Sequence, residues 1–286
     1  MKTILYFLIA IIVFGIIATG YAHQVTSKNR ILIISADNIV SPDLLTQSAK
    51  IISNRLKSFS SEKFDITVNS SKNQIQVELT NDWDLNVVKN LLTQKGALAF
   101  YETYNQKSLA ELINGDNKLF SLLNIDDTRK SSVKIGCTSS ANFDKVNAYI
   151  STMDLEQKCK FAWQQVSGNS EICLYALRLN GEKGALLVDS DIESVKVNQD
   201  KKLKNFELAI NLKKSAIELW ANATKRNINN AIAIVMDNNV LSAPIVNSVI
   251  DGGKCIVAGD FTQSEIRYFA ALGNNGALPV SFKVLK

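Results

Sequence analysis

An apolar run followed by a turn signal constrains the fold of this chain most strongly. Residues Ile232–Met236 are all apolar, Asp237-Asn238-Asn239 follow, and Val240 and Leu241 resume the apolar pattern. Because Asp and Asn tolerate the positive φ angles of tight turns, the pattern predicts a β-hairpin with its tip at these three residues. Pro244 lacks the N–H that a central strand needs, so the returning strand should leave the sheet there. We expect Leu241 to be buried and the tip to be exposed.

The residues after the hairpin predict a second reversal, a strand and a capped helix. Gly252-Gly253 marks the reversal, and residues 255–258 have the apolar character of a short strand. Thr262 and Glu265 have the spacing of a capping box, in which hydroxyl and carboxylate satisfy free amides at a helix start. Gly273 is expected to close this helix. Its predicted buried face contains Ile266, Phe269 and Ala270.

The chain before Asn105 carries strand and helix signals in a ferredoxin-like order. Ser41-Pro42-Asp43 predicts a helix start, since Ser caps, Pro fits the first turn and Asp favours the positive end of the dipole. A second helix should begin near Leu85 and end by Gly96. The order predicts a compact sheet with both helices on one face. The predicted strands are 30–36, 64–68, 75–79 and, as the closing strand, 97–104.

The middle of the chain has weaker periodicity and is rich in Ser, Asn, Asp and Lys. Apolar spacing predicts one or two short helices within 109–123 and another within 143–150. Residues 174–177 and the alternating stretch 206–212 predict strands. Ser215-Ala216-Ile217-Glu218 has the pattern of a second capping box and predicts a helix start.

The order of the C-terminal signals resembles the first periplasmic domain of the SecD family of protein-export membrane proteins. Lys95 to Glu102 also resembles the closing strand of that family's base. The resemblance implies an α+β fold with a ferredoxin-like base at residues 30–104, an inserted α+β head at 105–275 and a C-terminal strand at 276–286 that returns to the base. Gly96-Ala97-Leu98 and Gly276-Ala277-Leu278 are expected to be paired strand starts. The residues that match the family's motifs are Asp237, Ser242, Ala243, Pro244, Gly259, Phe261, Thr262, Glu265, Gly276, Ala277, Leu278 and Pro279.

The first 22 residues predict export to the far side of a membrane. Residues 3–22 contain no charge and have about the length that a helix needs to cross a bilayer. A cleavable signal peptide, cut before His23, is the alternative. We favour a retained transmembrane helix at 1–22, followed by a linker at 23–29, because the apolar run is long for a signal core. This predicts a single-pass protein of the inner membrane with its bulk in the periplasm.

Four cysteines fall in the exported part, where disulfides form readily. They permit three pairings, and no Cys-x-x-Cys spacing indicates redox catalysis or zinc. Cys255 lies in an apolar strand pattern and is expected to be a buried small residue. The four are Cys137, Cys159, Cys173 and Cys255.

Residue counts argue against enzymatic chemistry. His23 is the only histidine and adjoins the predicted membrane segment, so catalytic triads and multi-histidine metal sites are excluded. Asp237 is best explained by turn geometry. The net charge of +5 is modest, and Lys residues alternate with acids around 191–204, which does not support nucleic-acid binding. We expect no catalytic residue, metal or cofactor.

Aromatic residues in the predicted head offer the other route to a site. Tyr149, Phe161, Trp163 and Tyr175 either form core or line a groove for an extended polypeptide. The resemblance implies an accessory role in protein export, with exported polypeptide or the Sec translocon as partner on the periplasmic side, and without a proton-conducting bundle of its own. The alternative is a stand-alone periplasmic or cell-surface binding module that has lost the export role.

Overall fold

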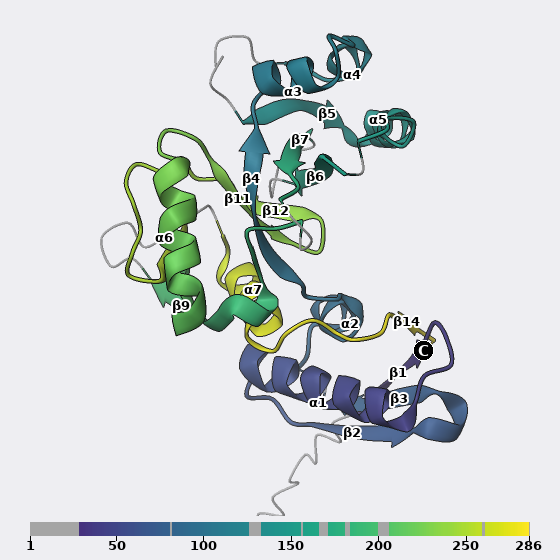
Figure 1. Ribbon diagram of the computed structural model, residues 1–286. Coiled ribbons are helices and arrows are strands. Elements are labelled where there is room, and N and C mark those ends of the chain that lie inside the picture. Colours follow the sequence, from purple (N-terminus) through teal and green to yellow (C-terminus); the bar gives the residue numbers. More distant parts are fainter. Residues whose placement is uncertain are drawn as a thin grey trace, which may run out of the picture.

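The structure is a computed structural model, and it describes residues 29–80, 82–125, 133–155, 157–165, 171–180, 184–199, 206–258 and 261–285. These residues form a mixed α+β fold, as predicted (Figure 1). Within them no helix combines the length and the apolar character needed to cross a bilayer. The predicted anchor at 1–22 lies outside the described residues.

The base is a four-stranded antiparallel sheet in the order β14-β1-β3-β2 (Figure 1). Its apolar face packs against two helices, since Leu45, Ile52 and Leu91 share one core with Ile34 and Val77. The first helix starts as predicted, with the Ser41 hydroxyl accepting from the Leu44 N–H at 3.3 Å. The base elements are β1 (Arg30–Ala36), α1 (Pro42–Phe59), β2 (Phe64–Asn69), β3 (Gln74–Leu79), α2 (Leu85–Thr93) and β14 (Phe282–Val284).

The predicted closing strand of the base is wrong. Strand β4 (Leu98–Tyr104) leaves the base and pairs with β11 (Ile232–Met236) in a different sheet. The fourth position of the base sheet is taken by β14, which pairs with β1. β4 is largely buried on both faces, as a central strand is, and its residue pattern carried no information about which sheet it would enter.

The part of the chain between α2 and β14, called the head from here on, contains five strands that close into a small barrel. β4 pairs with β11, β11 with β12 (Asn239–Ser242), β12 with β6 (Cys159–Gln165), β6 with β7 (Glu171–Arg178), and β7 again with β4. Strands β5 (Lys134–Ser139) and β8 (Leu187–Val188) extend this sheet at its edges. Alternate residues of the five strands fill the interior. They include Tyr101, Ala162, Tyr175, Leu177, Ala233, Val235 and Val240.

Helices and a separate three-stranded sheet pack around the outside of this barrel (Figure 1). One outer face shares a core with the short helices α3 (Gln106–Leu112), α4 (Lys118–Ser121) and α5 (Ser140–Ile150). The opposite face belongs to a core that runs continuously into the base. That core includes helices α6 (Ile217–Arg226) and α7 (Gln263–Asn274) and a three-stranded sheet of β9 (Ile192–Gln199), β10 (Phe206–Leu212) and β13 (Lys254–Ala258).

The predicted hairpin is confirmed. Asp237 and Asn238 form its two-residue turn with φ angles of 55° and 103°. Leu241 is only 7% exposed and belongs to the main core. Strand β12 ends at Ser242, before Pro244. The tip is not uniformly exposed, because Asp237 is half-buried whereas Asn238 is exposed.

The two predicted capping boxes had different outcomes. The Thr262 box is confirmed, with the Thr262 hydroxyl accepting from the Glu265 N–H at 3.2 Å. The Ser215 box is wrong, because a 3₁₀ turn, Lys214–Ala216, leads into α6 without a side-chain cap. Gly273 does not end α7 either. It lies inside the helix, where a Cβ would stand 3.0 Å from Val195 Cγ2, so glycine permits close packing on β9.

Candidate functional site

An open groove of about 1130 Å³ lies where base and head meet. Its walls come from α2 of the base, from α7, from the β11–β12 hairpin and from β6 with α5 above it. These segments are remote in sequence, and the pairing of β4 with β11 brings them together (Figure 1). The groove is therefore a product of the head's insertion between α2 and β14.

Aromatic rings form much of the groove wall. Phe143 of α5 and Trp163 of β6 lie with ring centroids 4.9 Å apart, and the Trp163 indole N–H donates to Asn147 Oδ1 at 3.0 Å. On the α7 side, the Phe269 ring lies 5.9 Å from Phe261 and 5.4 Å from Tyr268. The rings are held by their neighbours, so they offer an ordered apolar surface to a ligand.

Below the groove, polar contacts join the two chain segments that connect base and head, residues 94–97 and 276–278. We call this region the crossing. The Asp237 carboxylate accepts from the N–H groups of Gly96 and Ala97, each at 2.8 Å. The Leu278 N–H donates to the Lys95 carbonyl at 2.8 Å, so the two chain segments that join base and head lie side by side. Residues 96–98 and 276–278 were expected to begin two paired strands. Among the described residues, only this hydrogen bond joins the backbones there, because Leu278 is not part of a strand.

Arg55 of α1 ties this crossing together from the base. Its guanidinium is fully buried and donates to four backbone carbonyls, those of Leu91, Gln94, Lys95 and Gly276, at 2.6 to 3.2 Å. Burial lowers the pKa of Arg55 to about 10, and the nearby Asp237 carboxylate opposes that shift. Sequence reasoning missed this residue. The signal was present, since position 55 falls on the apolar stripe of α1 beside Ile52 and Leu56.

The four aromatic candidates do not gather at one place. Trp163 lines the groove and a second hollow of about 360 Å³, and Phe161 lines only that hollow. Tyr149 contacts Asp116 and lies under the Lys118 ammonium, and neither hollow includes it. Tyr175 is inside the barrel and 3% exposed, so it cannot line a groove in this structure.

The motif residues mostly build the walls and the crossing. Ser242, Phe261 and Glu265 line the groove, with Glu265 also bonding the Thr262 N–H at 2.9 Å. Gly276, at φ 72°, offers its carbonyl to Arg55. Gly259 lies outside the described residues. Of the remaining motif residues, Leu278 is buried, Ala243 and Ala277 are half-buried, and Pro244 and Pro279 are exposed.

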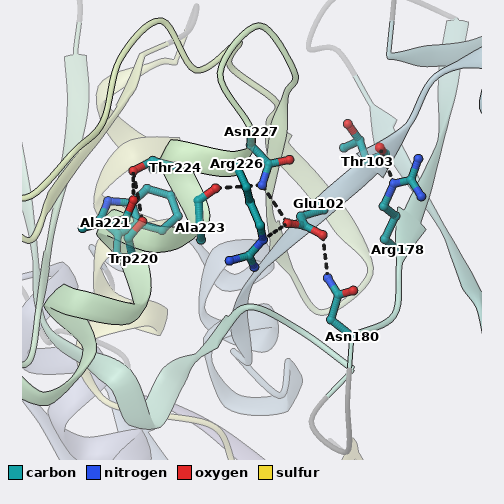
Figure 2. A network of polar contacts seen from close by, with 10 residues as sticks. All are labelled: Glu102, Thr103, Arg178, Asn180, Trp220, Ala221, Ala223, Thr224, Arg226 and Asn227. Atoms are coloured by element: carbon teal, nitrogen blue, oxygen red, sulfur yellow. Dashed lines mark hydrogen bonds and ion pairs between the residues drawn. The ribbon is translucent and has the colours of Figure 1, made fainter.

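A separate polar network braces α6 against β4 (Figure 2). Glu102 accepts from Arg226 Nε and Asn227 Nδ2 at 2.7 Å each and from Asn180 Nδ2 at 2.8 Å. Burial alone would raise the pKa of Glu102, but these hydrogen bonds outweigh it and hold the pKa below its ordinary value. The network thus joins β4 to the C-terminal end of α6 and to Asn180. The described part of the chain contains no group of three His, Cys, Asp or Glu side chains arranged to hold a metal.

Comparison with known proteins places these features in a family context. A family model described as "SecDF, P1 head subdomain" matches residues 176–280. The SecD translocase subunit of Leptotrichia buccalis is 33% identical over 108 residues, which cover 37% of this chain and 26% of that protein. The SecD of Syntrophobacter fumaroxidans is 27% identical over 177 residues, covering 60% of this chain and 33% of that protein. This chain thus spans a third or less of either relative.

Two solved structures share the fold. A crystal structure of SecDF in a super-membrane-facing form superposes with a TM-score of 0.56 at 16% identity, covering 90% of this chain and 29% of that one. A second, described as a membrane component SecDF that enhances protein export, gives a TM-score of 0.54 at 16% identity and covers 90% of this chain and 98% of its own. The resemblance to the first periplasmic domain of SecD is confirmed by the sequence and fold matches together.

Proposed function

We propose that this chain, a relative of the first periplasmic domain of SecD, assists protein export by holding extended segments of exported polypeptide in the groove. Residues 1–22 would anchor it in the inner membrane, with the groove on the periplasmic side. The observation that supports this most directly is the open, aromatic-walled groove between the hairpin, α7 and α2. Its mechanism would be reversible binding, without covalent chemistry.

The groove's chemistry suits a polypeptide better than a compact polar ligand. The lining combines aromatic and aliphatic side chains with neutral amides such as Asn90, Gln94 and Gln165, which can pair with backbone groups. Binding of this kind depends little on the ligand's sequence. That property fits an export accessory, because many different polypeptides would pass it.

A photo-crosslinker placed in the groove would test the proposal in cells that export protein. We expect crosslinks from position 261, and we expect Trp163→Ala to reduce them because it removes the largest ring of the wall. Tyr149→Ala is the matched control, since this half-buried aromatic packs against the same small core as Trp163 but lies outside the groove. Equal crosslinking in wild type and Trp163→Ala would contradict the proposal.

Co-purification with translocon components tests the export role separately. Association of the full chain with the translocon, together with crosslinks to nascent exported protein, would support the accessory role. Crosslinks to polypeptide without that association would instead favour the stand-alone periplasmic binding module.

A further inference from the structure

We infer that a polypeptide in the groove binds as an added β-strand along residues 240–242 of β12, the part of its edge that faces β6 without pairing to it, where it replaces a hydrogen bond made by Gln164. This inference rests on the proposed function and specifies its ligand as a segment in extended conformation. Strand addition supplies affinity through main-chain hydrogen bonds, so it needs no particular ligand sequence.

The edge of β12 that faces β6 is paired at a single position. Asn239 pairs with Trp163 in parallel orientation, and the backbone N–H of Trp163 donates to the Asn238 carbonyl at 3.2 Å. No further backbone pairing joins the two strands within their described residues. Val240, Leu241 and Ser242 then line the groove on one side. Gln164, Gln165 and Ile172 line it on the other.

A bulge prepares this edge to accept a partner. On its other side β12 pairs Val240 with Val235 and Ser242 with Ile234, which leaves Leu241 as the extra residue. A bulged residue is unpaired in the ladder, and the bulge bends the strand locally. The Leu241 carbonyl is therefore available to a donor from outside the hairpin.

In the free protein that donor is a side chain. Gln164 Nε2 lies 3.4 Å from the Leu241 carbonyl, and the Tyr175 hydroxyl donates to Gln164 Oε1 at 2.9 Å. Tyr175 is fixed inside the barrel, so it orients the Gln164 amide toward the edge. Gln164 thus occupies the place of a strand N–H. Its long bond is one that a backbone N–H of better geometry can displace.

N-methylated peptides test the binding mode directly. The probe is a fluorescein-labelled peptide of about ten alternating Thr and Val residues, a length that spans a strand of ordinary size, titrated against the full chain in detergent. A strand paired along one edge uses the N–H groups of alternate residues only. We expect single N-methyl groups to weaken binding about tenfold or more at alternate positions and to leave it nearly unchanged between them.

Substitutions test the role of Gln164. Gln164→Leu should strengthen binding about two- to tenfold, because the ligand no longer competes for the Leu241 carbonyl. Tyr175→Phe should act in the same direction but less, since it only releases Gln164. Gln165→Leu is the matched control, because it adds equal apolar surface to the groove without freeing that carbonyl.

The outcomes separate this inference from the proposed function. If Trp163→Ala abolishes binding but N-methyl groups act without regard to position, strand addition is wrong and the groove proposal stands. If Gln164→Leu and Gln165→Leu change binding equally, Gln164 does not hold the edge. If the probe binds Trp163→Ala as well as wild type, the groove itself is not the binding site, and both proposals fail.

Discussion

The carboxylate of Asp237 accepts a hydrogen bond at 2.8 Å from the backbone N–H of Gly96, which lies 141 positions earlier in the chain. Its second oxygen accepts from Ala97, also at 2.8 Å. A residue at a hairpin turn thereby holds the segment through which the chain leaves the base. Arg55 binds the carbonyl groups of the same segment from below, so the crossing is held by charged side chains on both sides.

Asp237→Asn should therefore lower the free energy of unfolding by about 1.5–3 kcal/mol, the usual range for hydrogen bonds to a charged group. Asn tolerates the φ of 55°, so the turn itself is preserved. The loss comes from replacing one accepting oxygen with an N–H₂ group that faces a backbone N–H. Urea unfolding measures it, and an unchanged midpoint would mean that the two amides find other acceptors.

Leu241→Ala and Asn238→Gly form a matched pair on the same hairpin. The leucine is 7% exposed in the main core, so its truncation should cost about 2–5 kcal/mol through lost burial and the cavity left behind. Asn238 is exposed with a φ of 103°, a region that glycine reaches without strain, so Asn238→Gly should be neutral or slightly stabilising. Thermal unfolding that shows the tip variant as the more damaging one would contradict this structure of the hairpin.

Local chemistry predicted the hairpin, the Ser41 and Thr262 caps and the amphipathic helices, because each depends on neighbouring residues. The partner of β4 was not predictable in this way. Leu98 and Phe100 face one core and Tyr101 faces another, which marks a central strand but does not identify its neighbours. The groove was equally out of reach, since Gln94, Trp163 and Tyr268 meet only after base and head have assembled. The place of Asp237 in a turn already explained that residue, so nothing in the sequence indicated its hydrogen bonds with Gly96 and Ala97.

The cysteines give a prediction that resolves the pairing left open by the sequence. Cys137 and Cys173 are bonded between β5 and β7, whereas Cys159 and Cys255 are buried thiols whose pKa burial raises to about 12. With a separation of 36 residues, reduction should cost about 3–4 kcal/mol by the chain-entropy relation. Peptide mapping should find this one bond, and alkylation of the other two should require unfolding.

The control for the disulfide is the double variant Cys137→Ala/Cys173→Ala. Its stability should already be reduced and should not respond to reductant. A further loss on adding reductant would reveal a second disulfide and contradict the assignment of Cys159 and Cys255 as free thiols.

Glu102 gives stability that depends on pH. Its folded-state pKa lies below the ordinary value of 4.5, so its contribution is fully present above about pH 4.5 and is lost as the pH falls through the lower folded value. Glu102→Gln should cost about 1–2 kcal/mol at pH 7, because the hydrogen bonds from Arg226 and Asn180 lose their charge (Figure 2). The difference between wild type and variant should shrink in more acidic buffer. Glu218→Gln, on an exposed face of α6, is the control and should change the free energy of unfolding only slightly at pH 7.

Two glycines at the crossing separate backbone strain from packing. Gly96 and Gly276 have φ angles of 77° and 72°, so alanine at either position should cost about 1–2 kcal/mol from the left-handed conformation. At Gly276 a Cβ would meet nothing within 4 Å, and that cost should be the whole effect. At Gly96 the Cβ would stand 2.4 Å from Arg55 Nη2, a buried group held by backbone carbonyls. Gly96→Ala must displace that guanidinium, so its total cost should reach roughly 3–5 kcal/mol. Urea unfolding of the two variants measures the difference, and equal costs would mean that Arg55 can move aside without losing its bonds to Lys95 and Gly276.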